Sequence, residues 1–173
     1  MAPEVGRLPP AMPPRQYTFI VLLCGFLALS MNVVALVSPS WVTSKDFSLS
    51  LWEMCSRRNQ AWHCRSALNS DWQVATLILV LCATLISGVW FIVSVLWICQ
   101  VKQPLKFRNL SFLLLISVLL QISALLLFSL LLAAPLLPLS SLFSWGYGLA
   151  WGSCIFTLGA VVISCLRTGL SIE

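Results

Sequence analysis

The chain has 173 residues, of which 60% are hydrophobic and only 9% are charged, and its formal net charge is +5. Soluble domains average about 45–50% apolar and about 25% charged residues, so this composition argues against a soluble enzyme. The ten basic and five acidic residues lie outside four long apolar runs and form no basic face along which nucleic acid would bind. We expect a membrane protein with no nucleic-acid partner.

Four uncharged runs, residues 17–38, 74–99, 110–134 and 145–166, are each long enough to cross a membrane. A helix needs about 20 residues, at about 1.5 Å per residue, to span about 30 Å of hydrocarbon. Because the runs lack the alternation of strands, the sequence predicts an all-α transmembrane protein, a four-helix bundle. The first run exceeds the about 7–15 apolar residues of a signal peptide, so we expect it to remain in the mature protein.

The basic residues predict the orientation of the chain. Six of them lie before the first run, between the second and third, or after the fourth, whereas four lie between the first and second. The positive-inside tendency then places a proline-rich leader, residues 1–16, and a short tail, residues 168–173, in the cytosol. A single four-span domain, residues 17–167, has its loops 39–73 and 135–144 outside. We expect a multi-pass protein of the plasma membrane with both termini cytosolic.

Two of the seven cysteines, Cys55 and Cys64, lie in the large external loop, and the other five lie in the apolar runs. An exposed pair facing an oxidising compartment is most simply a disulfide, which would contribute about 2–3 kcal/mol by closing a short loop. The alternation of Phe47, Leu49 and Leu51 with polar residues indicates a strand with one apolar side. We therefore predict a small antiparallel β-sheet, pinned by this disulfide, in the first external loop.

Five residues of this loop follow the pattern W…LW-x-x-C…C, namely Trp41, Leu51, Trp52, Cys55 and Cys64. Together with Asp71-Trp72 and the stretch 143–147, this pattern resembles the signature of the claudin and peripheral myelin protein superfamily of four-span membrane proteins. The gap between the two tryptophans is nearest to that of its peripheral myelin and epithelial membrane protein branch. The resemblance covers residues 17–167 and implies a claudin-like domain.

The sequence departs from the superfamily pattern at two places. Met54 precedes the first cysteine, where the myelin-type branch typically has a glycosylated asparagine. The chain ends in Leu170-Ser171-Ile172-Glu173, which does not match the short ligand for PDZ scaffolds that claudins commonly carry.

Groups able to perform catalysis are missing from the apolar runs, which contain no Asp, Glu, Lys, Arg or His. The five cysteines in the runs are not spaced as the C-x-x-C pair of thiol oxidoreductases. His63 is the sole histidine, and its neighbour Cys64 is expected to be oxidised, so we predict no metal site. We expect no enzyme and no cofactor.

The strongest polar residues within the runs are Asn32 and Gln121. We expect them to form a hydrogen bond between adjacent helices, worth about 0.6 kcal/mol. Gly148, Gly152 and Gly159 share one face of the fourth helix and permit close approach of another backbone. That face is expected to pack within the bundle, with a contact between two copies of the chain as the alternative.

The leading hypothesis for function is a non-enzymatic tetraspan protein that organises cell contacts or membrane-protein assemblies, in cis or trans, through its first external loop. We expect Trp62, Arg57 and Arg58 to form the partner-binding surface, because they are the residues best placed for exposure. The alternative is a claudin-like paracellular barrier or pore, or an auxiliary subunit of a membrane channel. The slight positive excess of the loop would favour anions in such a pore.

The expected partners are the lipid bilayer, other membrane proteins and, as an alternative, a second copy of the chain. At the N-terminus, Pro10, Met12, Pro13 and Arg15 fit the polyproline ligand of SH3-type domains. A plain proline-rich leader is the competing interpretation of the same residues.

Overall fold

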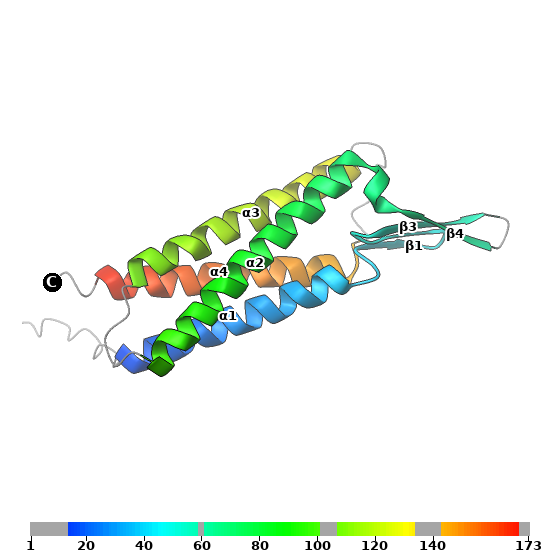
Figure 1. Ribbon diagram of the computed structural model, residues 1–173. Helices are drawn as coiled ribbons and strands as arrows, with labels where there is room; N and C mark the ends of the chain where they lie inside the picture. The colour runs from blue at the N-terminus through cyan, green and yellow to red at the C-terminus, as the bar shows by residue number, and fades with distance from the viewer. Residues whose placement is uncertain (1–13, 59–60, 101–106, 134–142, 170–173) are drawn as a thin grey trace, which may run out of the picture.

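The computed structural model describes residues 14–58, 61–100, 107–133 and 143–169, which form four long helices and one small sheet (Figure 1). The helices are α1 (Pro14–Val37), α2 (Asp71–Gln100), α3 (Phe107–Ala133) and α4 (Trp145–Gly169). All four are long and apolar enough to cross a membrane. The four spans predicted from the sequence are therefore confirmed.

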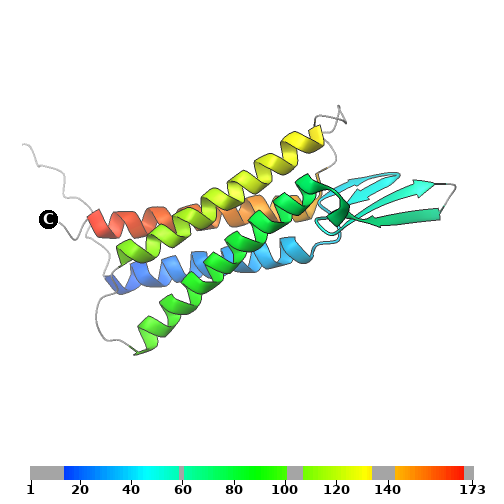
Figure 2. The ribbon, with the colours of Figure 1, turned by 45° about the horizontal axis from the view of Figure 1, so that its top comes forward.

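The helices form one bundle in which each packs mainly against two others, in the cyclic order α1, α2, α3, α4. Consequently α1 and α3 face each other across a diagonal, as do α2 and α4. The sheet lies at one end of the bundle, and the start of α1 and the end of α4 lie at the other (Figures 1 and 2). Large apolar side chains such as Phe19, Leu85, Leu130 and Ile155 are exposed on the outside of the bundle, where they contact lipid.

Three helices, α1, α2 and α3, start three residues before the predicted runs, and the starts of α1 and α2 have local causes. Helix α1 begins at Pro14, and proline suits the first helical position because its missing N–H has no partner there anyway. Helix α2 begins at Asp71, before the apolar run, and the carboxylate lies in the first turn, where the helix dipole favours negative charge.

The proposed SH3 ligand lies mostly outside the described residues, which begin at position 14. Its final residue, Arg15, lies in the first turn of α1 and is helical. A polyproline ligand needs an extended backbone at that arginine, so the expected SH3 contact does not fit the structure at this residue.

Between α1 and α2 the chain forms an antiparallel sheet of strand order β1-β2-β3-β4. Its strands are β1 (Val42–Ser44), β2 (Phe47–Leu49), β3 (Glu53–Arg58) and β4 (Ala61–Ser66), and a short 3-10 helix, Ala67–Asn69, leads into α2. Cys55 and Cys64 are direct cross-strand partners and form a disulfide. The predicted sheet and its disulfide are confirmed.

A buried polar network joins all four helices near the centre of the bundle. Gln121 of α3 donates to Asn32 Oδ1 of α1 at 2.9 Å, and its amide nitrogen also lies 3.1 Å from the carbonyl oxygen of Ala150 and 3.0 Å from Ser153 Oγ, both on α4. Asn32 in turn donates to Thr84 Oγ1 of α2 at 2.9 Å. In hydrocarbon no water can bind these groups, so they must bind one another.

The contact between Asn32 and Gln121 differs from the expectation in one respect. They do not lie on adjacent helices, because α1 and α3 are diagonal partners. Their hydrogen bond crosses the centre of the bundle, where both side chains are almost fully buried.

Three of the glycines of α4, Gly148, Gly152 and Gly159, do not share the one packing role expected of them. A Cβ atom at Gly152 would lie 2.5 Å from Met31 Cε of α1, so this glycine packs against a side chain of α1. At Gly148 and Gly159 no described atom lies within 4 Å of the Cβ position. The expected packing inside the bundle is therefore wrong for these two residues, which face outward.

Gly25 of α1 has the close contact that was expected of Gly148 and Gly159. A Cβ atom at Gly25 would collide with the six-membered ring of Trp90 on α2. That ring is buried with Val21, Leu114 and Ala160, and so fills the space between the four helices in the half of the bundle away from the sheet. Because the ring lies at the centre, α1 requires a residue without a side chain beside it.

Replacing Gln121 with leucine is expected to destabilise the protein by about 1–2 kcal/mol, because it leaves Asn32 Oδ1 buried without its donor. Replacing Asn32 with leucine is expected to cost less, about 0.6 kcal/mol, because Gln121 keeps its contacts with α4. The free energy of unfolding in mixed detergent micelles measures both, with Ser123→Ala on the exposed side of α3 as the control. Equal losses for the two leucine variants, or the opposite order, would contradict the network.

Candidate functional site: the sheet and its anchor on the bundle

The sheet has an apolar face that rests on the end of the bundle. Val42, Leu49 and Leu51, which lies in the turn between β2 and β3, are almost fully buried, and Phe47 and Met54 are half-buried beside them. They pack in one cluster with side chains from α1, α2, α3 and α4. The apolar residues of the alternating stretch, Phe47, Leu49 and Leu51, therefore pack the sheet against the helices.

Trp41 connects α1, the sheet and the bundle interior. Its ring is fully buried, with ring centroids 5.1 Å from Phe128 and 6.0 Å from Tyr147. Its indole N–H donates to the carbonyl oxygen of Ala35 at 2.8 Å, and its backbone N–H donates to that of Leu49 at 2.7 Å. The first tryptophan of the sequence pattern is thus a structural anchor, buried inside the protein.

Trp52, which follows the β1–β2 hairpin in the chain, makes the equivalent contact. Its indole N–H donates to the carbonyl oxygen of Leu36 at 2.7 Å. The last carbonyl groups of a helix have no partner within the helix, and α1 ends at Val37. The two indoles of the pattern therefore satisfy two neighbouring carbonyl groups at the end of α1, while the Trp52 ring stays 41% exposed.

Two small residues that the sequence analysis did not single out support this anchor. Ser50 Oγ accepts hydrogen bonds from the backbone N–H groups of Trp52 at 3.1 Å and Glu53 at 2.8 Å, which shapes the turn that presents Trp52. At Gly146 a Cβ atom would lie 2.7 Å from the carbonyl oxygen of Ser40, so the start of α4 lies directly against the backbone that follows α1. Serine and glycine at loop ends are too common to reveal either role in advance.

The hairpin formed by β3 and β4, Glu53–Ser66, extends beyond the bundle (Figures 1 and 2). All six residues of β4 are exposed, as are Arg57 and Arg58 of β3. Arg57 is the direct cross-strand partner of Trp62, which is 52% exposed. Arg58 is partnered by Ala61 and lies on the opposite face, because successive residues of a strand alternate. The structure thus pairs Arg57 with Trp62 and separates Arg58 from them.

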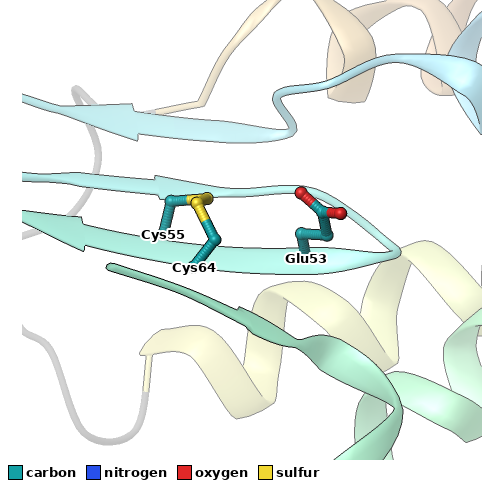
Figure 3. Close-up of side chains that lie close together, drawn as sticks. All are labelled: Glu53, Cys55 and Cys64. Carbon is teal, nitrogen blue, oxygen red and sulfur yellow. A yellow bond between two sulfur atoms is a disulfide. The ribbon is translucent and has the colours of Figure 1, made fainter. Parts of the chain in front are cut away.

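One face of this hairpin carries Glu53 beside the disulfide (Figure 3). Ligand atoms of Glu53, Cys55 and Cys64 lie within 4.8 Å of one another. Metal ions bind thiolates, however, and these two sulfurs are bonded to each other. His63 pairs with Ser56 and lies on the other face of the hairpin. The oxidised hairpin therefore does not fit a zinc site.

Replacing Trp52 with phenylalanine keeps an aromatic ring but removes the N–H that binds Leu36, which should destabilise the protein by about 1 kcal/mol. Trp62→Phe is the matched control, since no hydrogen bond of its indole is described, and it should leave stability unchanged within about 0.5 kcal/mol. Thermal unfolding in detergent compares the two. If both variants unfold like the wild type, the indole contact with α1 contributes nothing.

Comparison with known proteins identifies relatives of this chain. No protein-family model matches it. It is similar to the Danio rerio protein named "p53 apoptosis effector related to PMP-22", with 28% identity over 151 residues that cover 85% of this chain and 82% of the relative. This similarity, the four spans and the disulfide-bonded sheet agree with the pattern of tryptophans and cysteines. The chain is a four-span membrane protein that resembles the claudin and peripheral myelin protein superfamily.

Proposed function

We propose that this protein is a non-enzymatic organiser of cell contacts or membrane-protein assemblies, and that it binds its partners through the β3–β4 hairpin. The observation that carries the proposal is the exposure of Trp62, Arg57 and Arg58 on a hairpin that stands beyond a firmly seated sheet. Aromatic and arginine side chains are the residues most enriched at interface hot spots.

The proposed orientation places the sheet outside the cell, the termini in the cytosol and the protein in the plasma membrane. Two observations support it. The hairpin contains a disulfide, and disulfides persist in oxidising compartments. Six of the ten basic residues lie before the first apolar run, between the second and third or after the fourth, and the positive-inside tendency assigns these segments to the cytosol.

Lateral assembly is a second element of the proposal. Gly148 and Gly159 face outward on α4, and small residues on a lipid-facing helix allow another helix to approach closely. Other membrane proteins in cis, or a second copy of the chain, are the partners that such a face would accept. The proposed absence of enzymatic activity rests on the lack of ionisable residues in the apolar runs.

Proximity labelling in living cells tests this proposal, combined with surface staining of an epitope inserted after Arg58. The wild type should stain without permeabilisation and label a set of cell-surface membrane proteins. The variant Arg57→Ala/Trp62→Ala should reach the surface and lose those partners, because the hairpin contact is removed. Thr43→Ala, on the exposed part of β1, is the control. An unchanged partner set in the double variant would contradict the proposal.

The alternative of a claudin-like barrier or pore, or of an auxiliary channel subunit, is supported by the arginines exposed on the hairpin. The electrical resistance and ion selectivity of epithelial monolayers distinguish it from the first proposal. A rise in anion selectivity that disappears in Arg57→Ala would favour the pore. Unchanged conductance, together with loss of labelled partners, favours the organiser of contacts.

A further inference from the structure

The charges of the sheet are unevenly distributed along the β3–β4 hairpin. From Met54 to Ser70 the chain contains three arginines, Arg57, Arg58 and Arg65, together with His63, and no acidic residue. The acidic Glu53 lies at the first position of β3, paired with Ser66 at the last position of β4, and Asp46, in the turn before β2, accepts a hydrogen bond from the backbone N–H of Arg57 through its carbonyl oxygen at 2.8 Å. The part of the hairpin farthest from the bundle is therefore cationic.

The arginines of the hairpin are free to bind a partner. Arg57, Arg58 and Arg65 are all exposed, and within the described part of the chain none of them has an ion-pair partner. They lie on both faces, because Arg57 is beside Trp62 whereas Arg58 and Arg65 lie on the face of His63. The face with Arg58, His63 and Arg65 carries no acidic residue, whereas Arg57 shares its face with Glu53 and lies beside Asp46.

We infer that the hairpin binds sulfated glycan chains outside the cell. This inference rests on the proposed function, since it names the class of partner that the same surface would recognise. Guanidinium groups bind the oxygens of tetrahedral oxyanions through paired hydrogen bonds. The exposed Trp62 ring beside Arg57 offers a flat apolar surface on which a sugar ring can stack.

The elongated shape of the hairpin suits a linear polyanion. Two strands of six residues, at about 3.4 Å per residue and about 4.8 Å between strands, make each face about 20 Å long and about 10 Å wide. A charged polymer that follows this length gains affinity by releasing counterions, which requires a few well-placed cations and little buried area.

Two other occupants fit the hairpin less well. A second copy of the chain would bring arginines against arginines, and like charges at an interface are unfavourable. The bilayer surface is not the occupant either, because the hairpin extends away from the bundle along its length (Figures 1 and 2). The negative surface potential of a cell membrane also belongs to its cytoplasmic leaflet.

The test uses the full-length protein in nanodiscs of neutral phosphatidylcholine over immobilised heparin. The test variant is Arg57→Gln/Arg58→Gln/Arg65→Gln, and the control, with the same loss of charge outside the hairpin, is Lys102→Gln/Lys106→Gln/Arg108→Gln. The wild type and the control should bind alike, with affinity falling as salt rises, and the hairpin variant should bind at least about tenfold more weakly. Thermal unfolding and an intact disulfide verify that each variant is folded.

Several results would overturn the inference. These are absence of heparin binding, equal losses in both triple variants, and equal affinity for desulfated heparin. Stronger binding to polyglutamate than to heparin would assign the surface to an acidic protein instead. If heparin binding fails while Arg57→Ala/Trp62→Ala still loses its labelled partners in cells, the proposed function stands without the glycan. If heparin binds but the labelled partners do not depend on the hairpin, the proposed function fails and the glycan site stands.

Discussion

The carbonyl groups at the end of α1 impose the constraint on which the rest of the structure depends. The last carbonyl oxygens of a helix lack partners within the helix, and here the indoles of Trp41 and Trp52 bind those of Ala35 and Leu36, the former shared with the backbone N–H of Ser38 at 3.3 Å. The chain between these tryptophans must return to the same helix end, so β1 and β2 form a short hairpin. The fixed position of β2 in turn sets the direction of β3 and β4, and the hairpin projects from the bundle with its arginines exposed.

The helices below the sheet are held together differently in the two halves of the bundle. Towards the sheet, Phe128, Tyr147 and Trp41 form an aromatic cluster, followed by the polar network around Gln121. In the other half the ring of Trp90 fills the centre and packs against Gly25. Lipid tails are as apolar as the helix surfaces, so the hydrophobic effect does not drive the helices together within the bilayer. Specific packing and hydrogen bonding therefore determine which helices are in contact. The network links all four helices at one level and so specifies their mutual register.

Much of this architecture could be predicted from the sequence, because length, hydropathy and the paired cysteines are local signals. The spans, the sheet and the disulfide needed no knowledge of how the helices are arranged. The diagonal placement of α1 and α3, by contrast, depends on all four helices at once, and no pattern around Asn32 or Gln121 reveals it. The glycines show the same limit: Gly148 and Gly159 share a face with Gly152 but have no described atom within 4 Å of their Cβ positions, whereas the isolated Gly25 lies against a tryptophan. On the hairpin, the exposure of the arginines could be expected from their charge. Only the strand register places Arg57 beside Trp62 and Arg58 on the other face.

Amide hydrogen exchange of the double variant Trp41→Phe/Trp52→Phe in nanodiscs tests the central claim most directly, since it reports on the sheet and the helices separately. Loss of both indole donors should accelerate exchange throughout β1 and β2, while the amides in the middle of α3 remain as protected as in the wild type. Unchanged protection of β1 and β2 would show that the sheet is held on the bundle by something other than the end of α1.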